Sequence, residues 1–349
     1  MTNDTKIMTR VARTSLKDIA RELGVSTALV SFALNDVGRK HRVSDEMIRK
    51  IKAKAAELDY HPNSAARSLR SGKSNTIGVI LSDISNRFFA DIARCIEDQA
   101  SKNGFTVLFG STDESVAKLE STLKVFINKG VDGLIVVPCE GCEQIISELS
   151  GEDIPLVLID RTFDELNVNS ITLDNAGATS IAVKELVSQG FRRIGYISYK
   201  TGLANILNRE AGYVDAMTSL SLMDNIYIVK ADYGHLKEDL GKIIPKALED
   251  GCDSLIFSTN RIAIESLIVL RQLGRKIPDD VAVIAFDGSE TFAFELYDTG
   301  ISYVKQPVRM FGEQAFSVLY DIMRGKAAYE TMNIKLKPEL VLRESSLKR

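Results

Sequence analysis

From residue 76 onward, short β-branched and apolar runs alternate with helical patterns, and very few fold classes accommodate such an alternation. The runs read TIGVIL, FTVLFG, GLIVVP, PLVLID, RIGYIS, SLIFST and VAVIAF. Segments with helical periodicity lie between them, and those at 114–128 and 175–189 have the length of crossover connections. The alternation predicts βαβ units and parallel sheets, and the number of runs suits two doubly wound lobes.

The segment TSLKDIARELGVSTALVSFALN, residues 14–35, has a different pattern. Ser15 begins a capping box, and apolar residues then recur with the period of a helix. Gly24 ends this predicted helix, Ser26 caps a second one, and Ser44 begins a third. Two short helices joined by a tight turn and braced by a third are typical of a helix-turn-helix, although a generic three-helix bundle would show the same periodicity.

The outward face of the second predicted helix favours the helix-turn-helix. It carries Thr27, Ala28, Ser31 and Phe32, and small side chains let a helix enter a DNA groove closely. Charge agrees with this interpretation. Residues 1–75 hold 15 Lys and Arg against 8 Asp and Glu, a net charge of +7, whereas the rest of the chain has a net charge of −10. A basic head on an acidic body suggests a polyanion-binding module attached to a domain with another role.

Three segments carry a family resemblance. LKDIARELGVSTALVSFALN, YHPNSAARSLRSGKSNTIGVILSDISNRFF and LVLRESS resemble bacterial transcription regulators of the lactose/galactose-repressor family, and the resemblance covers nearly the whole chain. It implies an all-α helix-turn-helix head and an α/β, periplasmic-binding-protein-like core of two doubly wound lobes. The implied parts are a DNA-binding domain at 1–60, a hinge helix and linker at 61–75, and an effector-binding and dimerisation core at 76–349. Within the core we expect an N-lobe of about 76–173 and 304–325, and a C-lobe of about 174–303 and 326–349.

By this resemblance, the second helix reads the major groove, with Thr27, Ala28 and Phe32 at or beside the bases. Phe32 departs from the family, in which arginine is common here, because its ring can make only apolar contact, for example with a thymine methyl. The basic loop GRKHR, residues 38–42, could contact phosphate or simply be solvated. The residues expected at the DNA are Ser26, Thr27, Ala28, Ser31, Phe32, Asn35, Asn63, Ala66, Leu69 and Arg70.

The segment PNSAARSLRSGKSN, residues 62–75, predicts one short helix whose only large apolar residue is Leu69. So short a helix should form only against a second copy or DNA. In the family, two such helices lie in the minor groove and insert leucines into a base step. Leu69 matches that wedge, and Ala66 and Arg70 flank it. An ordinary linker is the alternative.

In open α/β sheets, ligands bind beyond the carboxyl ends of the strands, where this sequence has carboxylates, an amide and an arginine. The resemblance points to the same ends, and it adds a serine, two phenylalanines and Arg209. The residues expected to bind an effector are Ser82, Asp83, Phe88, Phe89, Asp160, Arg161, Arg209, Asn260 and Asp287. This mixture suits a sugar or sugar derivative. For single residues, helix capping or core packing is the alternative, and Val137 replaces a polar residue of some relatives.

Other classes of protein fit the sequence less well. There is no G-x-G-x-x-G motif and no nucleophile elbow, and three histidines offer little base chemistry, so we expect no catalytic residues, cofactor or metal. The lone C-x-x-C at Cys139 and Cys142 is interpreted as small residues in a loop. No stretch approaches 18 apolar residues, and the N-terminal segment lacks the apolar region of a signal peptide. We therefore expect a cytoplasmic homodimer, away from membranes, that binds operator DNA under the control of a small molecule.

Overall fold

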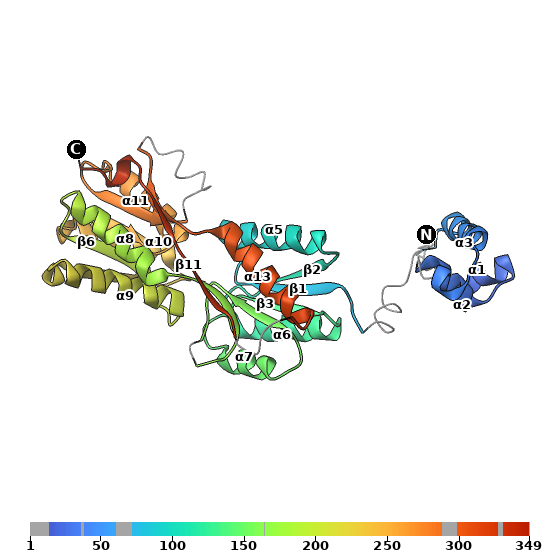
Figure 1. Cartoon of the computed structure of the whole chain (residues 1–349). Coiled ribbons are helices and arrows are strands. Elements are labelled where there is room, and N and C mark those ends of the chain that lie inside the picture. Colours follow the sequence, from blue (N-terminus) through green and yellow to red (C-terminus); the bar gives the residue numbers. More distant parts are fainter. Residues whose placement is uncertain are drawn as a thin grey trace, which may run out of the picture. The chain divides into compact units, whose positions relative to one another are not determined.

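The computed structural model describes residues 14–35, 38–60, 72–163, 165–287, 299–326 and 331–348. The chain divides into two compact units, Met1–Ser74 and Asn75–Arg349 (Figure 1). The predicted hinge residues Asn63, Ala66, Leu69 and Arg70 lie outside the described residues.

The first unit has the predicted helix-turn-helix architecture. Its elements are α1 (Leu16–Leu23), α2 (Thr27–Leu34), a 3₁₀ turn η1 (Gly38–His41) and α3 (Asp45–Glu57). The Ser15 N–H donates to the Asp18 carboxylate over 2.9 Å at the start of α1, and Gly24 ends that helix with a φ of +66°. The side chains that hold the three helices together and are fully buried are Ile19, Val30, Ala33 and Ile51.

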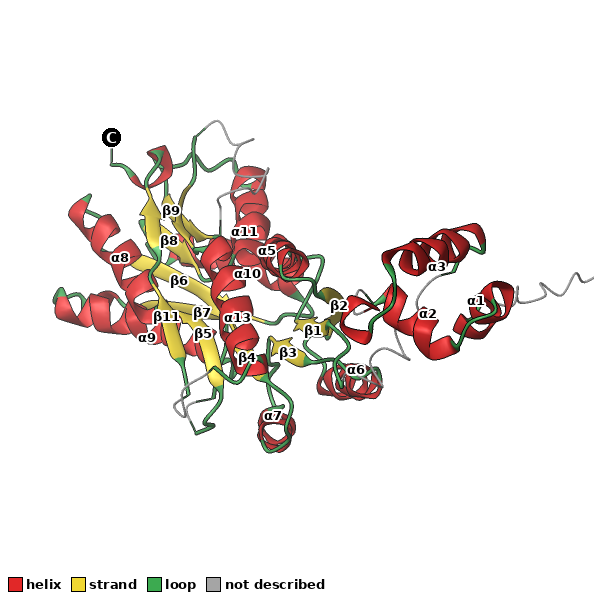
Figure 2. Cartoon of the chain, turned by 45° about the vertical axis from the view of Figure 1, so that its right-hand side comes forward, coloured by secondary structure: helices red, strands yellow, loops and turns green. Residues whose placement is uncertain are grey.

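The second unit is built on two sheets, each six-stranded within the described part of the chain (Figure 2). The first has the strand order β11-β5-β4-β3-β1-β2, and all its pairs are parallel. Its strands are β1 (Thr76–Leu81), β2 (Thr106–Ser111), β3 (Gly133–Val136), β4 (Leu156–Ile159), β5 (Asn169–Leu173) and β11 (Asn333–Leu336). One face packs against α5 (Arg87–Lys102) and α13 (Val308–Met323), and the other against α6 (Val116–Asn128) and α7 (Glu143–Ser150).

The second sheet has the order β12-β10-β9-β8-β6-β7, and only β12 runs antiparallel to its neighbour. Its strands are β6 (Ile194–Tyr199), β7 (Tyr227–Ala231), β8 (Ser254–Phe257), β9 (Ala282–Phe286), β10 (Ser302–Lys305) and β12 (Glu339–Val341). Helices α8 (Asn175–Ser188) and α9 (Ala204–Ser219) cover one face, and α10 (Leu236–Glu249) and α11 (Asn260–Gln272) cover the other. Short 3₁₀ turns are η2 (Met223–Asn225) and η3 (Glu344–Ser346). Among the described residues, none of the helices combines the length and the apolar character that a membrane crossing requires.

Helices on both faces explain the near-continuous apolar runs in the sequence. In β1, Val79 and Leu81 pack with the layer of α5 and α13, whereas Ile80 packs with the layer of α6 and α7. Successive side chains of a strand point to opposite faces, so a strand covered on both sides has no solvated position. The fold class predicted from these runs is confirmed.

The lobe boundaries differ from those predicted. Lys305 ends β10, which pairs with β9 in the second sheet, so the crossover follows residue 305 and does not precede 304. The strand β11 pairs with β5 in the first sheet (Figure 2), so the last crossover lies at 337–338 rather than near 326. Gly325, with a φ of +66°, only ends α13. The sequence signal of β11 is weak, because this short edge strand, NIKL, buries only Leu336 fully.

Candidate functional sites

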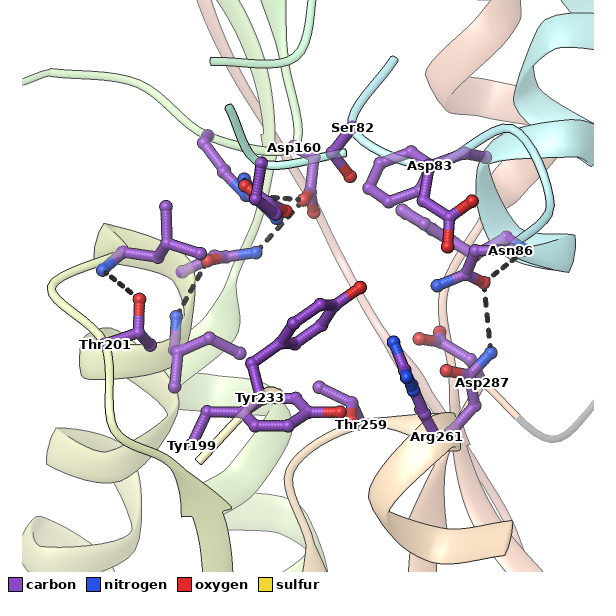
Figure 3. Close-up of a pocket in the computed structure, with 18 of the residues that line it drawn as sticks. Ser82, Asp83, Asn86, Asp160, Tyr199, Thr201, Tyr233, Thr259, Arg261 and Asp287 are labelled. Atoms are coloured by element: carbon purple, nitrogen blue, oxygen red, sulfur yellow. Dashed lines mark hydrogen bonds and ion pairs between the residues drawn. The ribbon is translucent and has the colours of Figure 1, made fainter. Parts of the chain in front are cut away.

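A cavity of about 990 Å³ lies between the two lobes, beyond the carboxyl ends of the parallel strands (Figure 3). All the residues expected from the sequence to bind an effector line this cavity: Ser82, Asp83, Phe88, Phe89, Asp160, Arg161, Arg209, Asn260 and Asp287. They come from both lobes. The topology thus brings together side chains as far apart in the sequence as Ser82 and Asp287.

Asp160 and Asp287 occupy equivalent positions in the two lobes. Asp160 follows β4 and Asp287 follows β9, and both have left-handed backbones, with φ values of +66° and +57°. Each backbone N–H donates to the next strand of its sheet, to the Ile171 carbonyl over 2.9 Å and to the Val304 carbonyl over 3.0 Å. Left-handed backbone is uncommon outside glycine, and it concentrates at functional sites. The matching geometry places one carboxylate from each lobe in the cavity wall.

Arg209 supplies the positive charge that both aspartates experience. Its side chain, on α9, is 2% exposed. The Nε donates to the Asn175 side-chain oxygen over 2.8 Å, and Nη1 donates to the Ser258 carbonyl over 2.7 Å. The guanidinium carbon lies 4.2 Å from the centroid of the Phe286 ring. These contacts fix the guanidinium in one orientation, as a preorganised binding group requires.

The two carboxyl groups are poorly solvated. Burial raises the pKa of Asp287 to about 6, although Arg209 and an N–H from Gln306, 2.7 Å away, act in the opposite direction. Burial also raises the pKa of Asp160, and Arg161 and Arg209 oppose that shift. Asn205 donates to Asp160 Oδ2 over 3.0 Å, whereas Oδ1 is buried with no hydrogen-bond partner among the described residues. A hydroxyl of a bound ligand would satisfy this acceptor.

Arg161 lines the cavity, but its donors are largely used within the first lobe. It forms a bidentate ion pair with Glu114, with N···O distances of 2.8 and 2.7 Å, and Nη1 also donates to the Pro138 carbonyl over 2.9 Å. The Glu114 carboxylate therefore balances the positive charge of Arg161, and the pair forms a fixed part of the cavity wall.

The phenylalanines serve the core and the cavity together. Phe88 and Phe89, at the start of α5, are buried, and their ring centroids lie 5.0 Å apart in an edge-on arrangement. Both residues therefore pack in the core and also line the cavity.

Hydrogen bonds also connect the lobes across the cavity. Asn260 Nδ2 donates to Asn86 Oδ1 over 3.3 Å, and Thr201 Oγ1 donates to Glu140 Oε2 over 2.7 Å. Glu140 lies between Cys139 and Cys142, which are both buried.

Two aromatic residues of the cavity were missed by sequence reasoning. Tyr199 ends β6, and Tyr233 follows β7, with 5.5 Å between their ring centroids. Tyr233 is 43% exposed, and the Arg261 guanidinium carbon lies 4.6 Å from its ring centroid. Figure 3 shows the Tyr233 hydroxyl directed into the cavity. A position directly after a strand is the sequence signal that could have identified Tyr233, but β7 was not among the strands predicted.

The exposed face of α2 carries the head residues expected at DNA. Thr27, Ala28 and Asn35 are exposed, and Ser31 and Phe32 are half-buried. The Ser26 hydroxyl accepts from the Leu29 N–H over 3.2 Å and so caps the helix, while Asn35 donates to the Ser31 carbonyl over 2.7 Å. These hydrogen bonds hold the two ends of α2, and the face between them is rich in small side chains.

Known proteins resemble this chain both in the helix-turn-helix head and in the two-lobed core. Residues 15–63 match the family described as bacterial regulatory proteins, lacI family, and residues 183–346 match the periplasmic binding protein-like domain. The HTH-type transcriptional regulator RegA of Clostridium saccharobutylicum is 30% identical over 343 residues, which cover 96% of this chain and 99% of the relative. A ribose operon repressor of Halalkalibacterium halodurans is 30% identical over 339 residues, covering 95% and 97%. The structure of the lac repressor dimer bound to operator and the anti-inducer ONPF superposes with a TM-score of 0.84 at 23% identity, covering 96% of this chain and all of that one.

Proposed function

Because the chain belongs to the lacI family of bacterial regulatory proteins, we propose that it is a homodimeric repressor whose affinity for operator DNA is set by a carbohydrate or carbohydrate derivative. As a member of this family it is a DNA-binding transcription regulator. The cavity between the lobes binds the effector and has no catalytic role. Since the partner is operator DNA, the protein works in the cytoplasm.

The observation that carries the carbohydrate assignment is the arrangement of Asp160, Arg209 and Asp287. Two carboxylates and one guanidinium with fixed orientation can accept from and donate to several hydroxyls of one ring. The nearby Arg161 is paired with Glu114, and acidic residues outnumber basic ones in the cavity lining, which disfavours an anionic ligand. Tyr233 adds an exposed aromatic face on which a ring could stack. A ribose operon repressor among the relatives fits the same ligand class.

At the DNA, we place Thr27, Ala28 and Phe32 at or beside the bases of the major groove, supported by Ser26, Ser31 and Asn35. The hinge residues Asn63, Ala66, Leu69 and Arg70 are assigned to the minor groove, from the sequence alone. Ligand binding favours one spacing of the two lobes over another, and this population shift changes the spacing of the hinges in the dimer. Coupling of this kind is typically worth about 1–3 kcal/mol.

A thermal-shift screen followed by operator titration tests this function. The panel contains sugars, sugar phosphates, nucleobases and uronates, and we expect a sugar to raise the melting temperature and to change operator affinity. Arg209→Ala and Asp287→Ala should each weaken calorimetric binding of that sugar, while effector-free operator affinity stays nearly unchanged. Stabilisation by a nucleobase alone would refute the carbohydrate assignment, and unchanged sugar affinity in both variants would refute the proposed site.

A further inference from the structure

The ring of Phe32, on α2, stacks on the ring of His41, which ends the turn η1. The ring centroids lie 3.8 Å apart, and the planes are within 7° of parallel. Such close, nearly parallel contact restricts both side chains. The sequence left open whether the loop that contains His41 contacts DNA or is merely solvated, and the stack bears directly on that choice.

The backbone of the turn places His41 at this position. Gly38 is buried against the neighbouring helices, and a Cβ there would lie 2.9 Å from Ile48 Cδ1 and 3.5 Å from the Ala33 Cα. The Val43 N–H donates to the Gly38 carbonyl over 3.0 Å, which closes the loop. Arg42 has a left-handed φ of +58°, and this reverses the chain directly after His41. The imidazole therefore has a defined position and is not carried on a loose loop.

The stacked pair belongs to the face of α2 that we assign to the major groove. Positions 27, 28, 31 and 32 share one helical face, and Thr27 and Ala28 on it are exposed. Phe32 is half-buried, whereas His41 is exposed. Phe32 itself has no hydrogen-bond donor, but the ring stacked on it has one. The stacked His41 therefore provides this face with a hydrogen-bond donor, its imidazole N–H, which Phe32 lacks.

We propose that His41 is a sequence-reading residue, and that its imidazole N–H donates to a base-edge acceptor, O6 or N7 of a purine, in the major groove. Phe32 is its positioning residue. This inference rests on the proposed role of the α2 face. Base contact is favoured over phosphate contact because the imidazole plane follows that of Phe32, while the exposed cations Lys40 and Arg42 on either side are suited to phosphates. A ring already held in place loses little conformational freedom on binding.

The test compares five variants of the full chain: His41→Phe, His41→Ala, Phe32→Ala, the double substitution of His41 and Phe32 by alanine, and Lys40→Ala. His41→Phe keeps an aromatic ring for the stack and removes the donor. The wild-type chain first selects its preferred duplex from a randomised pool, and each variant is then titrated against that duplex and a scrambled one at several salt concentrations. Thermal unfolding checks that each variant is folded.

We expect His41→Phe to lose roughly tenfold in affinity for the selected duplex, with scrambled affinity and salt slope unchanged. Repeated selection with this variant should show relaxed preference at one base pair. His41→Ala and Phe32→Ala should lose similar amounts, and the double substitution should add little, because the two rings act as a unit. Lys40→Ala should instead weaken both duplexes alike and reduce the salt slope.

Two results would overturn the proposal while leaving the proposed function intact. One is a His41→Phe variant with wild-type affinity and preference, which would make the stack a packing feature. The other is an equal loss on both duplexes with a smaller salt slope, which would identify a phosphate contact. A wild-type chain that selects no duplex would overturn this inference and the proposed function together.

Discussion

At the scale of a single residue, the protonation state of Asp287 makes effector binding depend on pH. Its pKa of about 6 reflects burial, so the carboxyl group is mostly protonated below pH 6 and ionised above it. A ligand hydroxyl that donates to the carboxylate favours the ionised form. Effector affinity should therefore fall as pH is lowered, by roughly tenfold between pH 7 and pH 5. Isothermal titration calorimetry at several pH values measures this dependence.

Asp287→Asn is the matched control, because asparagine has similar size and does not titrate. Its effector affinity should be lower at pH 7 than that of the wild type, and it should change less between pH 5 and pH 7, because only Asp160 of the two carboxyl groups can still titrate. If wild-type affinity does not change across this range, Asp287 does not bind the effector as a carboxylate.

At the scale of elements, α8 and α9 approach so closely that only glycine fits at the contact. A Cβ on Gly212 would lie 2.2 Å from the Ala176 carbonyl oxygen and 2.6 Å from its Cα, and backbone atoms cannot rotate away. Gly212→Ala should destabilise the core by about 1–3 kcal/mol, measured as a lower urea midpoint. Because α9 also carries Asn205 and Arg209, Gly212→Ala should lower effector affinity as well as stability.

Gly241 provides the control for this prediction. It lies in α10, it is exposed, and a Cβ there would meet no atom within 4 Å. Gly241→Ala should leave stability unchanged or raise it by up to about 1 kcal/mol, through helix propensity alone. Equal midpoints for the two variants would show that the α8–α9 contact tolerates a methyl group.

The hinge segment gives a third prediction, and it depends on the sequence pattern alone. Leu69→Ala removes the expected wedge but keeps helix propensity and the neighbouring positive charges. Specific affinity should fall more than non-specific affinity, the salt slope should hardly change, and DNA bending should diminish. Titrations of operator and scrambled duplexes, together with a bending assay, measure these effects. An equal loss on both duplexes, or none, would make Leu69 part of an ordinary linker.

At the scale of the whole molecule, the two units should separate in function. The core has its own complete sheets and hydrophobic layers, and the basic charge lies in the head. A fragment of residues 76–349 should remain dimeric by light scattering and bind effector with unchanged affinity, but it should lose specific operator binding. Retained operator affinity would contradict the assignment of DNA recognition to the head.

Sequence patterns predicted the strands that lie in a long apolar run, and they missed short strands in which polar residues interrupt the run. β5, NSITL, buries Ser170, whose hydroxyl donates to Asn333 over 2.7 Å. The partner lies in β11, 163 positions away, so no local pattern shows that this serine can be buried. The omission of β11 then led to the wrong final lobe boundary.

The cavity was predicted to the extent that its residues directly follow strong strands. Asp160 and Asp287 were found in this way, whereas Tyr233 follows the unpredicted β7. The pairing of Arg161 with Glu114, and the hydrogen bond between Asn205 and Asp160, depend on how distant segments meet. Such partners follow from packing, and composition and spacing do not reveal them.

The interleaving of the lobes also sets the order in which a growing chain can fold. The strands β1 to β5 of the first lobe end at Leu173, but α13, which covers α5, begins only at Val308, and β11 follows it. At about 5–20 residues per second, a ribosome needs on the order of ten seconds to reach α13, and until then the apolar face of α5 lacks its cover. The head needs nothing downstream for its own core. A message truncated within the second lobe would therefore yield a folded head attached to an incomplete core. Such a chain could still bind DNA, but it would lack the effector site and could not respond to a ligand.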